Sequence, residues 1–98
     1  MAQASFRLDG GEPGTVAVSG TLSFATAAAA LGELNAALAG GRHQLDLAGV
    51  SACDSAGLAC VLAVLAEAAR HGRAVRVLNA PAGLRALARV CGVEPMLA

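Results

Sequence analysis

The segment from Leu45 to Leu58 constrains the fold of this chain more than any other. It begins with alternating apolar and polar residues, which is typical of a strand, and passes through a short loop into a helix that opens on Asp-Ser-Ala-Gly-Leu. A helix that follows a strand in this way is typical of an α/β fold. Asp54 and Ser55 then lie at a helix N-terminus beyond the carboxyl end of a strand, where open α/β sheets place ligand and partner sites.

The same two periodicities divide the rest of the chain. Strands are predicted at residues 5–9, 15–19, 43–47 and 74–78, and helices at 23–39, 55–70 and 81–92. Ser23 is the expected cap of the first helix, and Pro81 suits the start of the third. The buried stripe of the first helix is predicted to comprise Phe24, Ala28, Leu31, Leu34 and Leu38. The tail 93–98 is too short to predict.

Each predicted strand has one apolar and one polar face. A sheet covered by helices on both faces would show nearly continuous apolar strands, so we expect helices mainly on one face. Right-handed crossovers on a single face step in one direction along the sheet, which predicts sequential strand order. Residues 1–98 are therefore expected to form one α/β domain of order β-β-α-β-α-β-α. Its uncovered face should carry Arg7, Gln44, Asp46 and Arg76.

Charge and composition exclude several classes of function. The formal net charge is zero and the only aromatics are two phenylalanines, which argues against nucleic-acid binding and against attraction to an anionic membrane. Residues 13–32 lack charge but also lack the sustained large apolar side chains of a spanning helix, and no secretory signal opens the chain, so no membrane insertion is expected. A lone glycine offers no phosphate cradle, and no cofactor is expected. We expect a cytoplasmic protein.

The three cysteines predict free thiols rather than a disulfide framework or a metal site. Cys53, Cys60 and Cys91 are odd in number and lack the CxxC spacing of a zinc ligand pair. Cys91 continues the apolar stripe of the third helix with Leu84, Leu87 and Ala88, so we expect it to be buried and Cys60 to be the more accessible thiol.

The second predicted helix carries the candidate partner-binding surface. Its buried stripe is predicted to comprise Leu58, Val61, Leu62, Leu65 and Ala69. The opposite side is small and uncharged over the first two turns, which favours a docking surface. This candidate surface comprises Asp54, Ser55, Ala56, Gly57, Ala59, Cys60 and Ala63. Three alternatives stay open: Asp54 serves only as a helix cap, Gly57 serves close packing on the third strand, and the alanines reflect composition alone.

A catalytic triad is not indicated. His43 begins a predicted strand and His71 ends a predicted helix, both far along the chain from Ser55. We therefore expect a protein that binds and carries out no reaction of its own.

Three segments together resemble the STAS domain family over nearly the whole chain. They are Leu45-Asp46-Leu47, Asp54-Ser55-Ala56-Gly57-Leu58 and Arg73-Ala74-Val75-Arg76-Val77. The family includes bacterial anti-sigma-factor antagonists and the small cytoplasmic STAS subunit of Mla-type phospholipid-transport ABC systems. The resemblance implies a non-enzymatic interaction domain.

One departure from the family motif distinguishes these two branches. In phospho-regulated antagonists, the second hydroxyl residue after the aspartate accepts the phosphate, and this chain has Ala56 there. Ser55 is disfavoured as a substitute because Asp54 would repel the added charge, so no phosphorylation is expected. Ser55 matches the polar residue that contacts the ATPase in the Mla-type branch. The resemblance thus favours an accessory subunit docking on an ABC-transporter ATPase. The alternative is an antagonist that binds a kinase-type anti-sigma factor.

Overall fold

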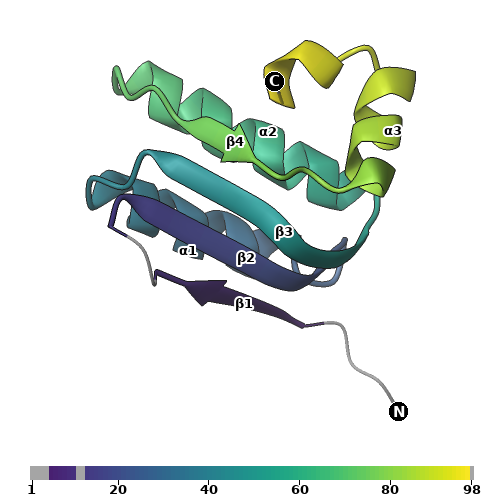
Figure 1. The fold of residues 1–98 in the computed structure, drawn as a ribbon, viewed down its shortest axis with the longest axis horizontal. Coiled ribbons are helices and arrows are strands. Elements are labelled where there is room, and N and C mark those ends of the chain that lie inside the picture. Colours follow the sequence, from purple (N-terminus) through teal and green to yellow (C-terminus); the bar gives the residue numbers. More distant parts are fainter. Residues whose placement is uncertain (1–4, 11–12, 98) are drawn as a thin grey trace.

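The computed structural model describes residues 5–10 and 13–97. They form a four-stranded sheet, three α-helices and a C-terminal 3-10 helix (Figure 1). The elements are β1 Phe6–Asp9, β2 Thr15–Leu22, α1 Ala27–Ala39, β3 Gln44–Cys53, α2 Ser55–Arg70, β4 Arg76–Leu78, α3 Ala82–Val90 and η1 Glu94–Leu97. The predicted α/β class and the order β-β-α-β-α-β-α are confirmed.

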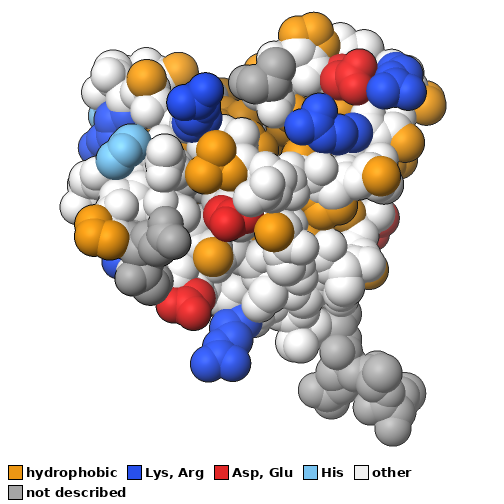
Figure 2. Space-filling model, viewed as in Figure 1, with side chains coloured by type: hydrophobic (Ala, Val, Ile, Leu, Met, Phe, Trp, Pro, Cys, Tyr) orange, Lys and Arg blue, Asp and Glu red, His pale blue; other side chains and the backbone are white. Residues whose placement is uncertain are grey.

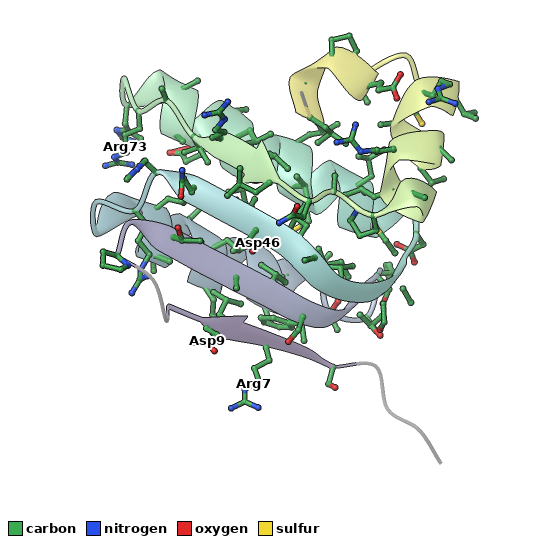
Figure 3. The ribbon with its side chains drawn as sticks, in the orientation of Figure 1. Arg7, Asp9, Asp46 and Arg73 are labelled. Carbon is green, nitrogen blue, oxygen red and sulfur yellow. The ribbon has the colours of Figure 1, made fainter. Side chains whose placement is uncertain are left out.

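The sheet has the predicted sequential order β1-β2-β3-β4. β1 pairs antiparallel with β2, while the pairs β2–β3 and β3–β4 are parallel. Figure 1 shows α1 and α2 behind the sheet, on the same face. The register pairs Arg7 with Ser19 and Gln44 with Arg76, which places these polar residues on the other face, as predicted. Arg7, Asp9 and Asp46 can be followed along this face in Figure 3.

The core lies between the sheet and the helices and consists mainly of leucine and valine. Burial of each such side chain contributes roughly 1.5–3 kcal/mol of transfer free energy. The sheet supplies Val16, Val18, Leu22, Leu45, Leu47 and Val50, and the helices supply Ala30, Leu34, Leu38, Leu58, Val61, Val64, Leu84, Ala88 and Leu97. Alanines at 30 and 88 let helices approach closely. Among the described helices, none combines the length and apolar character needed to cross a bilayer.

The start of α1 was predicted wrongly. The helix begins at Ala27 instead of Ser23, and Phe24, predicted to be buried, is 78% exposed. Ala28 is exposed as well. The cause is the buried hydroxyl of Thr26, which donates to the Thr21 carbonyl at 2.9 Å and accepts from the Ser23 N–H at 2.9 Å. These bonds hold residues 23–26 in a turn that precedes the helix.

Three strands also differ in length from the prediction, and the first of them, β2, runs to Leu22 instead of ending at residue 19. β3 runs to Cys53 instead of ending at residue 47, because β2 continues to Leu22 and pairs with it. Two register shifts in this ladder interrupt the period-two pattern and conceal the strand's second half in the sequence. β4 begins at Arg76 rather than residue 74, since its pairing with β3 starts at Gln44.

Helix α2 has the predicted bounds, but its buried face is rotated. Cys60, Val64 and Ala68 are buried, whereas Ala69, predicted to be buried, is exposed, and Leu62 and Leu65 are half-buried. The rotation arises because α2 packs against α1 as well as against the sheet, and Cys60 faces α1, where its thiol donates to the Ala27 carbonyl.

The end of the chain also departs from the prediction. Cys91 follows the last residue of α3 and is exposed, so its expected burial was wrong. Pro81 precedes the first helical residue, as its fixed backbone angle suggests. The tail forms η1, and its Leu97 side chain is only 1% exposed in the core.

Candidate protein-interaction site

Asp54 joins the start of α2 to the loop before α1. Its carboxylate accepts from the Gly57 N–H at 2.9 Å, which caps α2, and from the Phe24 N–H at 3.1 Å. These two bonds, the one from Gly57 first, hold the pKa of Asp54 below its ordinary value, so the carboxylate is ionised at neutral pH. The capping role is therefore present in the structure, and it also positions residues 23–26.

Gly57 serves close packing. It is buried, and a Cβ at this position would collide with the Leu22 carbonyl oxygen and lie 2.7 Å from the Leu22 carbonyl carbon and 2.9 Å from the Cys53 sulfur. Only glycine lets α2 begin this close to the ends of β2 and β3. Gly57 is therefore packed against β2 and β3 beneath the candidate partner surface and does not belong to its accessible face.

A shallow apolar groove of about 350 Å³ lies between α1 and α2. The residues lining it, which we call the docking groove, are Ala27, Ala28 and Leu31 from α1 and Ala56, Ala59, Cys60 and Ala63 from α2. All seven are uncharged and five are alanine. Four of the seven residues of the candidate partner surface therefore line one groove, and Ser55 is exposed beside it at the first position of α2.

The sequence did not reveal that α1 forms the second wall of this groove, or that Phe24 is exposed near it. Phe24 matches the spacing of the α1 stripe, so periodicity assigned it to the core. The available signal was the run of small residues at 27–30, which allows another chain to approach this side of α1. The exposed ring of Phe24 lies on the loop that Asp54 holds, at the same end of the molecule as Ser55. Phenylalanine is among the aromatic residues that are enriched in protein interfaces.

Of the two cysteines near the site, Cys60 is buried and Cys53 is half-buried, and both have thiols of low reactivity. Cys60 donates to the Ala27 carbonyl at 3.6 Å, and Cys53 donates to the Asp54 carbonyl at 3.4 Å. Burial raises the pKa of Cys60, and burial with the nearby Asp54 charge raises the pKa of Cys53 to about 11. The predicted order of accessibility is thus reversed, with Cys60 buried and Cys91 exposed. Neither Cys53 nor Cys60 is an activated nucleophile.

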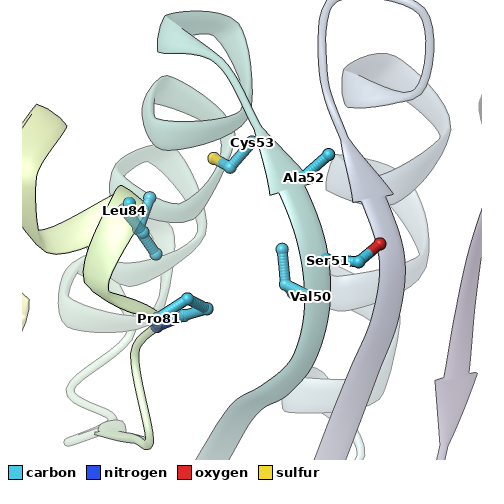
Figure 4. A pocket seen from close by; sticks show the side chains of 7 residues that line it. Val50, Ser51, Ala52, Cys53, Pro81 and Leu84 are labelled. Carbon is cyan, nitrogen blue, oxygen red and sulfur yellow. The ribbon is translucent and has the colours of Figure 1, made fainter.

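No catalytic or metal constellation accompanies the groove in the described part of the chain. His71 pairs with Glu67 at 3.0 Å, at the opposite end of α2 from Ser55. Among residues 5–10 and 13–97, no three His, Cys, Asp or Glu side chains are grouped to hold a metal ion. A smaller hollow of about 90 Å³ lies between the end of β3 and the start of α3 (Figure 4). The Ser51 hydroxyl in the lining of this hollow donates a hydrogen bond to the Gly20 carbonyl.

Fold and site together define a small α/β domain suited to protein interaction. A family model described as "Mlab, STAS domain" matches residues 7–98. The chain therefore belongs to the STAS domain family, as the sequence motifs indicated.

Two solved structures share the fold at low sequence identity. The anti-sigma factor antagonist SpoIIAA in its unphosphorylated form is 21% identical, with a TM-score of 0.69 over 93% of this chain and 84% of that one. The Bacillus cell fate determinant SpoIIAA in its phosphorylated form is also 21% identical, with a TM-score of 0.66 over 93% of this chain and 86% of that one. No curated protein sequence matches the chain significantly.

Proposed function

We propose that this STAS domain is a cytoplasmic accessory subunit of a phospholipid-transporting ABC system and docks on the system's ATPase. It acts by binding and supports assembly or activity of the ATPase without chemistry of its own. The observation that carries this proposal is the uncharged docking groove beside Ser55, at the polar start of α2. The description of the matching family model, "Mlab, STAS domain", supports the transporter branch of the family.

The physical argument rests on the size and polarity of the lining side chains. Alanine side chains on both walls of the docking groove let a partner backbone come close, and burial of apolar surface there is favourable. Ser55 and Asp54 at its end supply polar groups that orient the partner. An apolar centre with a polar rim is the usual anatomy of an interface.

The alternative is an anti-sigma-factor antagonist, which the fold likeness to SpoIIAA in two phosphorylation states supports. Ala56 weighs against a phosphorylated antagonist, because the position that would carry the acceptor hydroxyl has none. An antagonist without this switch would use the same surface. The identity of the partner separates the two hypotheses.

The test combines identification of the partner with substitutions in the docking groove. The tagged chain is purified from native cells, and the co-purifying protein is identified by mass spectrometry. Binding is then measured for Ala59→Arg, which places a charged side chain on the α2 wall of the groove, and for Ser55→Arg. A clash or an unpaired buried charge at an interface costs several kcal/mol, so both variants should lose binding.

The matched control is Ala36→Arg, another exposed alanine on a helix, outside the groove-lining set. Surface substitutions of this kind change stability by less than about 0.5 kcal/mol, so all three variants should melt like the parent chain. An ABC ATPase that binds the control but neither groove variant supports the proposal. Recovery of a kinase-type anti-sigma factor instead would establish the alternative. Full binding by Ala59→Arg would place the interface elsewhere.

A further inference from the structure

One end of the molecule is basic, and it lies opposite the end that bears Asp54 and Ser55. Four of the seven arginines and both histidines of the chain lie at or just after the ends of α1 and α2 or begin β4. These residues, the basic end, are Arg42, His43, Arg70, His71, Arg73 and Arg76. The Arg76 N–H donates to the His43 carbonyl at 2.9 Å, which brings the two turns together. In Figure 2, arginine and histidine side chains of this end lie at the left, and further arginines lie at the upper right, over α3.

Two arginines of the basic end have no side-chain partner of any kind among the described residues. Glu67 is engaged, because it pairs with Arg70 at 2.9 Å and with His71 at 3.0 Å. Arg42 donates to the carbonyls of Gly10 and Thr15. Arg73 and Arg76 make no side-chain hydrogen bond or ion pair within residues 5–10 and 13–97. Figure 3 shows the Arg73 side chain extending outward at this end.

Arg73 borders an apolar hollow of about 300 Å³. The hollow lies between α2, the segment before β4, and η1, and we call it the Arg73 hollow. Leu65 and Ala69 line it from α2, Val75 from the segment before β4, and Met96 from η1. Met96 is 51% exposed, and Arg73 is the one charged residue in the described lining. An apolar concavity is thus combined with a guanidinium that has no partner in the described structure.

We propose that the Arg73 hollow binds an acidic, apolar peptide segment of a protein partner. An aliphatic side chain of the segment enters the hollow, and an adjacent carboxylate pairs with Arg73. The planar guanidinium matches a carboxylate through two parallel hydrogen bonds, which gives both affinity and orientation. The positive charges of the basic end attract the same segment at longer range and raise the rate of association.

The shape of the site favours a peptide over a membrane surface. The apolar side chains line a concavity, which a protruding side chain can enter and a lipid surface cannot contact fully. The carboxylate of Glu67, about one-third exposed at this end, would also face an anionic lipid surface unfavourably. This site lies apart from the docking groove, so the two can be occupied at the same time and can be tested separately.

The test uses a short fluorescent peptide with glutamates on both sides of a central leucine pair. Its anisotropy is measured with the full chain, and a matched peptide has glutamine in place of each glutamate. We expect binding of the acidic peptide alone, weakening as salt rises. Arg73→Glu should reduce the affinity by about tenfold or more, as loss of a charged contact does at interfaces. Ala69→Phe, which fills the hollow at unchanged charge, should also reduce it.

The matched control is Arg7→Glu, which makes the same change of charge on β1, at the other edge of the sheet. It should retain peptide binding, and thermal melting of each variant verifies that it folds. If Arg73→Glu does not fold, Arg73→Gln replaces it. Equal loss with Arg7→Glu, equal binding of the glutamine peptide, or binding only to phosphatidylglycerol vesicles would each overturn the proposal. Binding of the ATPase by Arg73→Glu, measured in parallel, reports on the docking groove independently.

Discussion

Replacing Gly57 by alanine should destabilise the domain, although alanine is the better helix former. Gly57 lies in the first turn of α2, where alanine would normally be favoured by up to about 1 kcal/mol. Here the added methyl group would collide with the Leu22 carbonyl oxygen, and it would lie 2.7 Å from the carbonyl carbon and 2.9 Å from the Cys53 sulfur. The carbonyl belongs to β2, which is central in the sheet, so it cannot move aside cheaply.

The start of α2 must therefore shift away from the sheet. That shift lengthens the 2.9 Å bond from the Gly57 N–H to Asp54 and the 3.2 Å bond from the Asp54 N–H to the Leu22 carbonyl. Overpacking of this kind costs about 1–3 kcal/mol, which exceeds the gain from helix propensity. For a domain of this size, each kcal/mol lowers Tm by about 4–8 °C.

Gly32→Ala is the matched control. Gly32 lies within α1, and a Cβ there would meet no atom within 4 Å. The same change should stabilise this position by about 0.5–1 kcal/mol. Urea unfolding and thermal melting of both variants against the parent chain give the two free energies of unfolding. If Gly57→Ala proves as stable as Gly32→Ala, the close approach of α2 to β2 is wrong.

Three further outcomes are expected. Folding lowers the pKa of Asp54, so its contribution to the free energy of unfolding is present above the unfolded pKa of 3.8 and is lost as pH falls through the folded pKa. Asp54→Asn should therefore remove this part of the pH dependence of stability, measured by urea unfolding between about pH 2 and pH 5. A chromogenic disulfide reagent should modify exposed Cys91 rapidly, half-buried Cys53 more slowly because its pKa is raised, and buried Cys60 only after denaturation. Equally fast modification of all three thiols would contradict this order. Incubation with a kinase-type anti-sigma factor and ATP should leave the intact mass unchanged, and stoichiometric phosphate on Ser55 would revive the phospho-regulated antagonist.

The alternation of apolar and polar residues was sufficient to predict the architecture. One apolar face per strand implies helices on one face, and chirality of the crossovers then sets the strand order. The start of α2 was equally readable, because Asp54 caps the helix through a backbone group only three residues away. Signals of this kind depend on neighbours in sequence, and they determined the class of fold and the polar part of the candidate site.

Features that depend on distant contacts needed the tertiary structure. α1 begins late because Asp54, 30 residues beyond Phe24 in sequence, accepts a hydrogen bond from the loop that precedes the helix. A local bond from Thr26 to the Thr21 carbonyl holds the same loop. The same loop exposes Phe24, and packing of α2 against α1 buries Cys60 and creates the docking groove. The sequence by itself determined which elements form and where the polar helix start lies. Packing between elements decided which of their faces stay accessible, because burial depends on which surfaces meet.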